Sequence, residues 1–189
     1  MAIIQTIIFG TWILFWGYWL FSAIRDRSPY KRKQSPQSLL LYVIVLAVAW
    51  LLVTGMLSPG LLLEQVVPAT LPFAFAGLVV TTAGLSFAVW ARIHLGKNWS
   101  GSPAIRVDQR IIRTGPYRIV RNPIYAGILL GVTGTAIALG TVWALSTIVL
   151  LLAAFLLKIH VEEQFLLEEF GEEYLQYKRE VRALIPFVI

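Results

Sequence analysis

The sequence predicts an all-α, polytopic membrane protein, and three observations lead to this fold class. Of its 189 residues, 58% are hydrophobic, which is more than a soluble domain of this length could bury. Long runs of the chain contain no Asp, Glu, Lys or Arg. The charged residues gather between and after these runs, with basic residues in excess in two loops, as is typical of membrane proteins.

Five uncharged apolar runs are the predicted transmembrane elements. About 20 such residues cross a hydrocarbon core about 30 Å thick, so we expect the first three runs to span the membrane. The last two are shorter, and Gly140-Thr141 between them predicts a tight turn and a hairpin. Whether this hairpin crosses fully or only re-enters, both its ends emerge on one side. The runs are 2–24, 39–57, 73–91, 124–139 and 142–157.

The distribution of charge predicts the orientation. Segments 25–33 and 92–122 hold five and seven basic residues, each against one acidic residue. Segment 58–72 contains only Glu64 as a charged residue. By the positive-inside rule the two basic segments are cytoplasmic, which puts the N-terminus outside and the C-terminus inside. The net charge of +6 then reflects topology and contact with membrane lipid, and we expect no nucleic-acid partner.

Several classes of protein are disfavoured by what the chain lacks. It has no cysteine and two histidines, which excludes disulfides and thiolate sites and predicts no metal site. The apolar runs contain no ionisable side chain of the kind that transporters and pumps place at mid-membrane depth. The first run is too long for a signal peptide, and its basic cluster follows it, so we interpret it as a retained span.

One domain, 1–189, is the simplest organisation. We interpret 1–72 as a helical scaffold and 73–189 as a catalytic core that carries most of the polar residues. Segment 92–122 is interrupted by Gly and Pro, which predicts an irregular cytoplasmic region. Pro123 can begin the fourth helix, because the first turn needs no N–H donor. Beyond residue 158 we expect an acidic helix that turns basic before a hydrophobic end.

The stretch 115–127 is polar, basic and rigid, and it directly precedes a membrane helix. Pro123 favours an extended Asn122, and the free N–H groups of the following helix attract an anion. Arg121 beside them could bind a carboxylate through two hydrogen bonds. The alternative is that such arginines only anchor the loop to lipid phosphate, and we adopt it for Arg106, Arg110 and Arg113.

Glu162 and Glu163 follow the last apolar run, where the hairpin returns to the face from which it left. We therefore expect them to lie opposite Arg121, whereas the later glutamates form a solvated face. His94, near the inner end of the third run, fits a packing or hydrogen-bonding role as well as a ligand role. Gly127 and Gly131 have the G-x-x-x-G spacing of close helix packing, although such a face could also admit a ligand.

Residues 115–127, G-P-Y-R-I-V-R-N-P-I-Y-A-G, resemble the G-P-Y-R-x-V-R-H-P-x-Y-x-G signature of the isoprenylcysteine carboxyl methyltransferase (ICMT) family. The Glu162-Glu163 pair, F-G-E-E-Y-x-x-Y at 170–177 and the closing Pro-Phe are similar to its C-terminal signature, and L-G-K-N-W-S at 95–100 also fits. The resemblance covers 92–189. Asn122 stands where the signature usually has His, so this position can form hydrogen bonds but cannot titrate.

This resemblance implies a membrane methyltransferase that uses S-adenosyl-L-methionine, with the cofactor entering from the cytosol and a lipid-like substrate from the bilayer. The reaction it implies first is carboxyl O-methylation of an isoprenylcysteine-like substrate. A phospholipid or small-molecule N- or S-methyltransferase stays open as an alternative. So do an NADPH-dependent enzyme similar to sterol reductases and a non-enzymatic membrane scaffold. The expected partners are a lipophilic small molecule or prenylated substrate and membrane lipid.

The resemblance and the residues together give the predicted site. In it, Arg121 holds the carboxylate of the cofactor, Glu162 binds its hydroxyls or amines, and two tyrosines pack its adenine or sulfonium. Glu163 is the candidate base for an amine acceptor, and Arg182 orients an acidic substrate or anchors the tail. The predicted catalytic residues are Arg121, Glu163 and Arg182. The predicted cofactor-binding residues are His94, Gly115, Tyr117, Arg121, Asn122, Pro123, Tyr125, Gly127 and Glu162.

Overall fold

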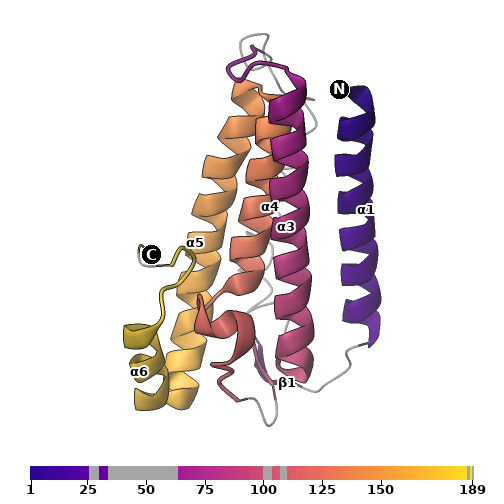
Figure 1. The fold of residues 1–189 in the computed structure, drawn as a ribbon. Helices are drawn as coiled ribbons and strands as arrows, with labels where there is room; N and C mark the ends of the chain where they lie inside the picture. The colour runs from indigo at the N-terminus through magenta and orange to yellow at the C-terminus, as the bar shows by residue number, and fades with distance from the viewer. Residues whose placement is uncertain (26–29, 34–63, 100–103, 107–109, 187, 189) are drawn as a thin grey trace.

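The computed structural model describes residues 1–25, 30–33, 64–99, 104–106, 110–186 and 188, and Figure 1 shows its elements. The predicted run 39–57 lies outside the described residues. The elements are α1 (Ala2–Arg25), β1 (Tyr30–Lys33), α3 (Leu71–Leu95), η2 (Gly96–Asn98), β2 (Ala104–Arg106), η3 (Gly115–Arg118), α4 (Pro123–Leu139), α5 (Val142–Phe170) and α6 (Glu172–Glu180).

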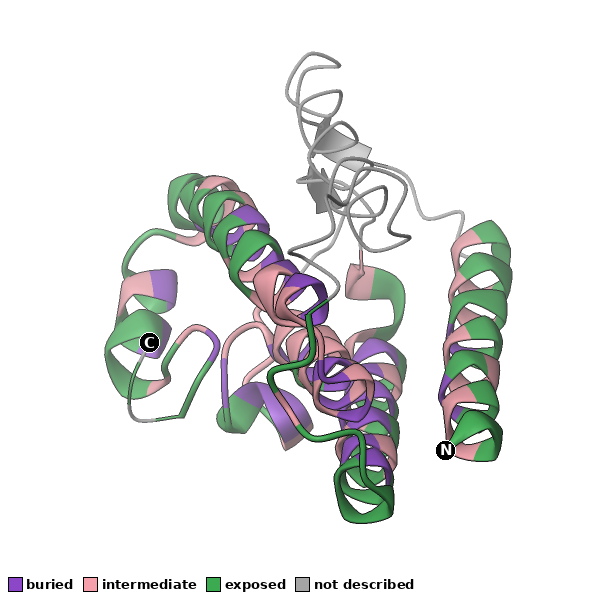
Figure 2. Ribbon diagram, turned by 90° about the horizontal axis from the view of Figure 1, so that it is seen from above, coloured by how far each residue is buried: buried purple, intermediate pink, exposed green. Residues whose placement is uncertain are grey.

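The long helices α3, α4 and α5 lie side by side, and α1 stands beside α3 (Figure 1). Among the described residues, three stretches are long and apolar enough to cross a membrane: α1, α3 with η2, and α5. The apolar helix α4 is shorter, at 17 residues. Large apolar side chains such as Ile13 and Leu14 are mostly exposed on α1, and outer helix faces are likewise exposed (Figure 2). Such faces suit contact with lipid.

The turn between α4 and α5 has the predicted tight geometry. Gly140 ends α4 with φ of 71°, a left-handed conformation that favours glycine. Thr141 caps α5, and its hydroxyl accepts a hydrogen bond from the N–H of Ala144 at 3.3 Å. The segment before α3 is held to this turn, because the N–H groups of Val66 and Val67 donate to the Gly140 carbonyl. The predicted hairpin is therefore confirmed.

Helix α5 continues well past the apolar run from which it was predicted. It has 29 residues, which corresponds to roughly 43 Å at 1.5 Å per residue and exceeds the hydrocarbon thickness. The segment 158–170 contains four Glu and two Leu, which favour helix, and it has no Gly or Pro before Gly171. Glu162 and Glu163 thus lie within a continuous helix.

Helices α3 and α4 are in direct backbone contact along a glycine seam, which comprises Gly77, Gly84, Gly127, Gly131 and Gly134. A Cβ atom at Gly84 would lie 2.5 Å from the Gly131 nitrogen and 2.6 Å from the Gly127 oxygen. A Cβ atom at Gly77 would lie 2.5 Å from the Gly134 oxygen. The close packing predicted from Gly127 and Gly131 is therefore confirmed.

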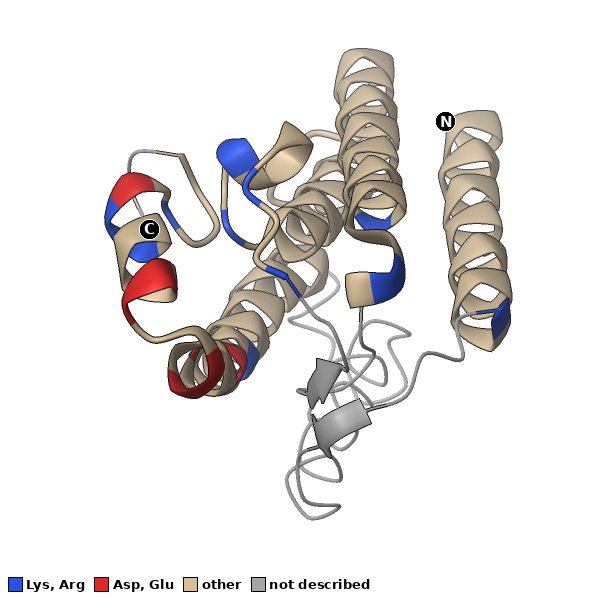
Figure 3. Cartoon of the chain, turned by 90° about the horizontal axis from the view of Figure 1, so that it is seen from below, with Lys and Arg blue, Asp and Glu red and all other residues tan. Residues whose placement is uncertain are grey.

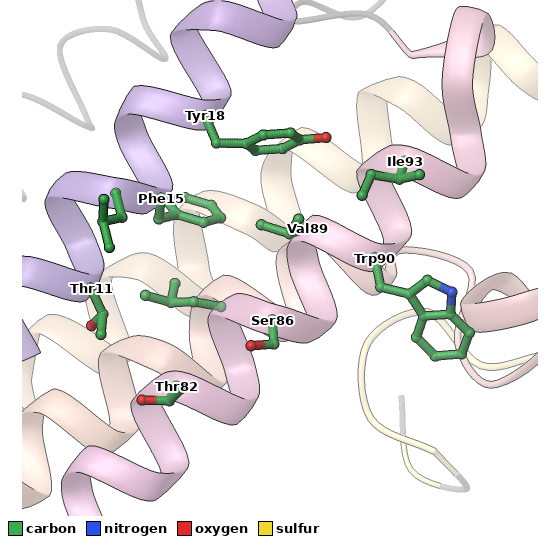
Figure 4. A pocket seen from close by; sticks show the side chains of 10 residues that line it. Thr11, Phe15, Tyr18, Thr82, Ser86, Val89, Trp90 and Ile93 are labelled. Atoms are coloured by element: carbon green, nitrogen blue, oxygen red, sulfur yellow. The ribbon is translucent and has the colours of Figure 1, made fainter.

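An apolar groove with a cavity volume of about 520 Å³ lies between α1 and α3 (Figure 4). Phe15 and Tyr18 line it from α1, and Val89, Trp90 and Ile93 line it from α3. Hydroxyl groups interrupt its apolar lining at a few positions only. The lining of the groove is therefore mostly apolar and suits an apolar ligand.

A small antiparallel sheet departs from the predicted all-α class. Strand β1 pairs with β2, with Tyr30 opposite Arg106 and Lys33 opposite Ala104. Both strands belong to the basic segments outside the apolar runs, where backbone N–H and C=O groups need partners that no helix supplies. The pairing brings these two segments, which are distant in sequence, to the same end of the helices (Figure 1).

Candidate functional site

The basic loop before α4 and the two adjacent glutamates of α5 meet at one end of the helices. Arg121 donates to Oε1 of Glu163 through Nη2 at 2.6 Å and through Nε at 3.0 Å. Lys178 of α6 donates to the other oxygen, Oε2, at 2.6 Å. We call Arg121, Glu163 and Lys178 the clasp. Figure 3 shows charged residues gathered on the end of α5, on α6 and on the neighbouring loop.

Arg121 and Glu163 of the clasp are largely shielded from solvent, whereas the Lys178 side chain is 49% exposed. The Arg121 side chain is only 7% exposed, and its Nη1 group donates to the backbone carbonyls of Lys178 and Val181. Burying a guanidinium is costly unless it is paired and hydrogen-bonded, and here every nitrogen of the group has an acceptor. The clasp therefore fastens the loop before α4 to α5 and α6, and the buried charge of Arg121 is fully hydrogen-bonded.

Main-chain hydrogen bonds hold the C-terminal segment along the start of α4. The N–H of Arg121 donates to the Arg182 carbonyl at 2.7 Å, and the N–H of Asn122 donates to the Ala183 carbonyl at 2.9 Å. The side-chain amide of Asn122 donates to the same Ala183 carbonyl at 3.2 Å. An amide suits this position because it supplies a permanent donor.

The same segment then enters the apolar layer beside the hairpin. Leu184 is 2% exposed and packs with Leu151, Phe155 and Ile159 of α5. Burying such a side chain contributes roughly 1.5–3 kcal/mol. The C-terminal segment is therefore part of the packed structure around the site.

Glu162 has a different environment from its neighbour. The Tyr125 hydroxyl lies 2.9 Å from each of its carboxylate oxygens, and the Tyr125 ring stacks on Phe155 with centroids 4.8 Å apart. The Lys158 ammonium lies 3.9 Å from Oε1 of Glu162 and 5.4 Å from the centre of the Tyr125 ring. The Glu162 side chain is 20% exposed, so solvent or a ligand can reach it.

The two glutamates are therefore not equivalent. Glu163 binds two cations of the protein itself, whereas Glu162 is bound by a neutral hydroxyl and a more distant cation. A carboxylate has acceptor capacity for several hydrogen bonds. Glu162 is thus the glutamate whose oxygens suit the hydroxyls or ammonium of a ligand.

A second polar contact lies next to the loop that carries Arg121, and it is formed by His94, Thr114 and Gly115. The Nε2 atom of His94 lies 2.9 Å from the Thr114 hydroxyl, and its ring is stacked on Tyr117 with centroids 6.4 Å apart. Gly115 has φ of 59°, and a Cβ atom there would lie 2.8 Å from the imidazole ring. Glycine is therefore favoured at position 115 for two reasons: the positive φ, and the close approach of the His94 ring.

Replacing Gly115 with alanine should destabilise the protein by about 1–2 kcal/mol, because an L side chain is strained at this φ and collides with His94. Thermal unfolding of the purified protein would measure the change. In a His94→Ala background the collision is absent, so a smaller loss is expected there. An equal loss in both backgrounds would show that His94 plays no part.

Helix α6 docks on the loop through tyrosines. The Tyr177 hydroxyl donates to the Tyr117 carbonyl at 2.6 Å, and Arg113 lies over the Tyr177 ring at 5.5 Å and donates to the Glu173 carbonyl. Burial raises the pKa of Tyr117 and of Tyr177 well above the usual range. Both hydroxyls are therefore protonated at neutral pH, which keeps Tyr177 a hydrogen-bond donor.

Three residues that build the site were not expected there from the sequence. We expect Arg113 at lipid phosphate, but the structure places it against α6. Tyr177 belongs to the F-G-E-E-Y-x-x-Y segment that resembles the family signature, but neither it nor Lys178 is among the predicted site residues. The spacing of Tyr174 and Tyr177 is a signal, since residues three apart share a helix face, whereas Lys178 lies outside that segment.

The remaining predicted residues lie around the same end of the protein. Pro123 is buried in the first turn of α4, as predicted. Gly127 faces α3 in the glycine seam, and packing accounts for it. Arg182 is exposed and contributes its backbone carbonyl. Their cofactor or substrate roles stay predictions.

The side chains at this site suit in part a nucleoside that carries an amino acid with a free carboxylate. Glu162 offers partly exposed acceptor oxygens, and Tyr125 offers an aromatic ring beside them. The guanidinium of Arg121 already donates to Glu163 and to two carbonyls, so it would have to exchange partners to bind a ligand carboxylate. Among the residues that the structure describes, no group of three or more His, Cys, Asp or Glu is placed to hold a metal ion.

The chain is similar in sequence and in fold to known proteins. Residues 73–173 match the family described as phospholipid methyltransferase. A probable protein-S-isoprenylcysteine O-methyltransferase of Oryza sativa subsp. indica is 35% identical over 112 residues, which are 59% of this chain and 53% of the relative. Protein-S-isoprenylcysteine O-methyltransferase A of Arabidopsis thaliana is 31% identical, over 59% of this chain and 58% of the relative.

The protein-S-isoprenylcysteine O-methyltransferase of Saccharomyces cerevisiae is 33% identical, over 59% of this chain and 43% of the relative. This chain thus spans about half the length of the curated relatives it matches. A solved structure of the eukaryotic intramembrane Ras methyltransferase ICMT superimposes with a TM-score of 0.58 at 25% identity. That similarity covers 82% of this chain and 54% of the other.

Proposed function

Because this chain belongs to the phospholipid methyltransferase family, we propose that it transfers a methyl group from S-adenosylmethionine to a lipophilic acceptor at the membrane. The relatives named above favour carboxyl O-methylation of an isoprenylcysteine-like acceptor. The observation that carries the proposal is the meeting of the 115–127 loop with Glu162 and Glu163 just beyond the apolar part of α5. The catalytic core would then be 73–189 within a single unit.

In this proposal Glu162 binds the ribose hydroxyls or the ammonium of the cofactor, and the Tyr125 and Tyr117 rings pack beside it. When bound, S-adenosylmethionine would supply an electrophilic methyl group, which an acceptor oxygen takes while the carbon–sulfur bond breaks with its electrons going to sulfur. A cation over an aromatic face gains about 0.5–2 kcal/mol. Stacking on Phe155 and the hydrogen bond to Glu162 fix the orientation of the Tyr125 ring.

A carboxylate acceptor requires no base, because it is already ionised near neutral pH. The clasp then has the task of fixing the loop, α5 and α6 in one arrangement, since alignment of the reacting atoms accounts for much of a transfer rate. For an amine acceptor Glu163 would have to take up a proton. Both its oxygens already bind cations, which opposes that role.

We also propose that the site faces the cytoplasm, with the N-terminus outside and the C-terminus inside. Two observations support this orientation. The basic segments before residue 34 and after residue 91 carry most of the positive charge, and cytoplasmic loops are enriched in Lys and Arg. Their pairing through β1 and β2 joins both segments to the site end of the helices.

The test uses the full chain in nanodiscs with a methyl-labelled donor and an S-prenylated cysteine that has a free carboxylate. Methyl ester formation is expected, and mild base should release the label. The methyl ester of the same acceptor should not take up label. Glu162→Ala should weaken binding of S-adenosylmethionine at least tenfold, whereas exposed Glu172→Ala should not. Absence of cofactor binding by the unaltered protein would overturn the proposal, and stabilisation by NADPH instead would indicate a reductase.

A second candidate follows from the description of the matched family. Methylation of an amine on a phospholipid headgroup would place the label in a base-stable N-methyl product. The same labelled donor with vesicles containing an ethanolamine phospholipid tests it. Recovery of label only in such a lipid would favour this candidate over the carboxylate.

A further inference from the structure

Lys158 is a charged residue that the sequence did not single out. It follows directly after the apolar run 142–157 of α5, so it lies where the hydrocarbon region is expected to end. Lysine side chains at such a position extend their ammonium groups towards the membrane surface. This is also the depth at which the polar head of a lipophilic acceptor would reside.

The Lys158 side chain points into the site and is only 20% exposed. Its ammonium lies 5.4 Å from the centre of the Tyr125 ring and 3.9 Å from Oε1 of Glu162. The second distance is longer than a hydrogen bond, whereas the carboxylate oxygens of Glu162 each lie 2.9 Å from the Tyr125 hydroxyl. The ammonium is therefore held near Glu162 without being its closest partner.

Cations lie close to both glutamates: Arg121, Lys158 and Lys178 each lie within 4 Å of a carboxylate oxygen of Glu162 or Glu163. S-adenosylmethionine carries two positive groups and one carboxylate at neutral pH, so its binding would add one net positive charge. Weakly solvated charge of one sign is unfavourable. An anionic acceptor head would offset the added charge, and a protonated amine would increase it.

We propose that the Lys158 ammonium binds the carboxylate of the acceptor and thereby selects anionic over neutral and cationic acceptors. The inference rests on the proposed methyl transfer and adds a specificity-determining residue to it. Tyr125 and Glu162 position the ammonium, and the apolar run below it leaves the chain of the acceptor in the lipid layer. A charge-assisted hydrogen bond of this kind is stronger than a neutral one.

The experiment compares Lys158→Met, Lys158→Arg and the unaltered protein in nanodiscs. The acceptor is an S-prenylated cysteine with a free carboxylate, and the competing ligand is its primary amide, which has the same prenyl chain but no charge. In Lys158→Met the KM for the carboxylate should rise about tenfold while the inhibition constant of the amide changes less than twofold. Lys158→Arg should restore the KM to within about threefold. Binding of S-adenosylmethionine should be unchanged.

Arg179→Met is the matched control. Arg179 is 73% exposed and pairs with exposed Glu172 at 3.5 Å, so this change removes one positive charge from the same end of the protein without touching the site. It should leave the KM unchanged. Equal weakening of carboxylate and amide in Lys158→Met would overturn the inference, as would loss of cofactor binding. If the unaltered protein methylates no acceptor, the proposed function itself fails.

Discussion

Replacing Glu163 with alanine should reduce the rate of methyl transfer about 100-fold or more and lower stability by about 3–5 kcal/mol. The stability loss is expected because Arg121, only 7% exposed, would keep a buried charge without its carboxylate. The rate loss follows from release of α6 and the C-terminal segment, since small displacements of reacting groups are costly. Initial rates at saturating substrate and chemical unfolding would measure the two effects.

Two further variants make this prediction decisive. Glu172→Ala breaks an ion pair whose side chains are both mostly exposed, so it should cost no more than about 1 kcal/mol. The double variant Arg121→Met with Glu163→Met removes both buried charges and should recover most of the stability. If the double variant recovers activity as well, the clasp only stabilises the arrangement of the loop, α5 and α6, and its charges are not needed for methyl transfer. Full activity in Glu163→Ala would contradict a role for the clasp altogether.

Replacing Gly84 with valine should be the most damaging change in the membrane part, with a cost of about 3 kcal/mol or more. The added atoms would meet the backbone of Gly127 and Gly131 at 2.5–2.6 Å, and backbone cannot rotate away as a side chain can. Thermal unfolding and the yield of monodisperse protein would report the separation of α3 from α4.

Gly17→Val supplies the control for this substitution. Gly17 lies on α1 and has no neighbour within 4 Å of an added Cβ atom. The same change there should alter stability by only a fraction of a kcal/mol and should not destabilise the helix, because glycine is a poorer helix former than valine. Gly84→Ala should fall between the two. Similar losses at Gly84 and Gly17 would show that the seam does not depend on close backbone approach.

The membrane elements were largely predictable because they depend on local sequence. The uncharged runs 2–24 and 73–91 became α1 and α3 with small extensions, and Pro123 and Gly140 mark the ends of α4 as expected. The acidic helix expected beyond residue 158 is present as the continuation of α5 to Phe170. Its continuity with the apolar run was harder to predict, because absence of charge delimits a span and not a helix. The β1–β2 pairing joins segments about 70 residues apart and has no local signal.

The site was predictable in position but not in its partners. A hairpin returns the chain to its starting face, which is why Arg121 and the glutamates were expected to meet. Which glutamate reaches Arg121 depends on the rotation of α5, since successive helical residues point about 100° apart. In the structure Glu163 pairs with Arg121, and Glu162 accepts a hydrogen bond from the Tyr125 hydroxyl. The predicted grip of Arg121 on a cofactor stays a prediction.

The glycine seam has a consequence for how an oily molecule gains access. Where two backbones touch without intervening side chains, no rotamer change can part them, so α3 and α4 behave as one stiff spine. If an acceptor enters sideways from the bilayer, as the proposed function requires, it would not pass between α3 and α4. Among the described helices, the places where side chains fill the space and can move aside are the contacts of this pair with α1 and with α5.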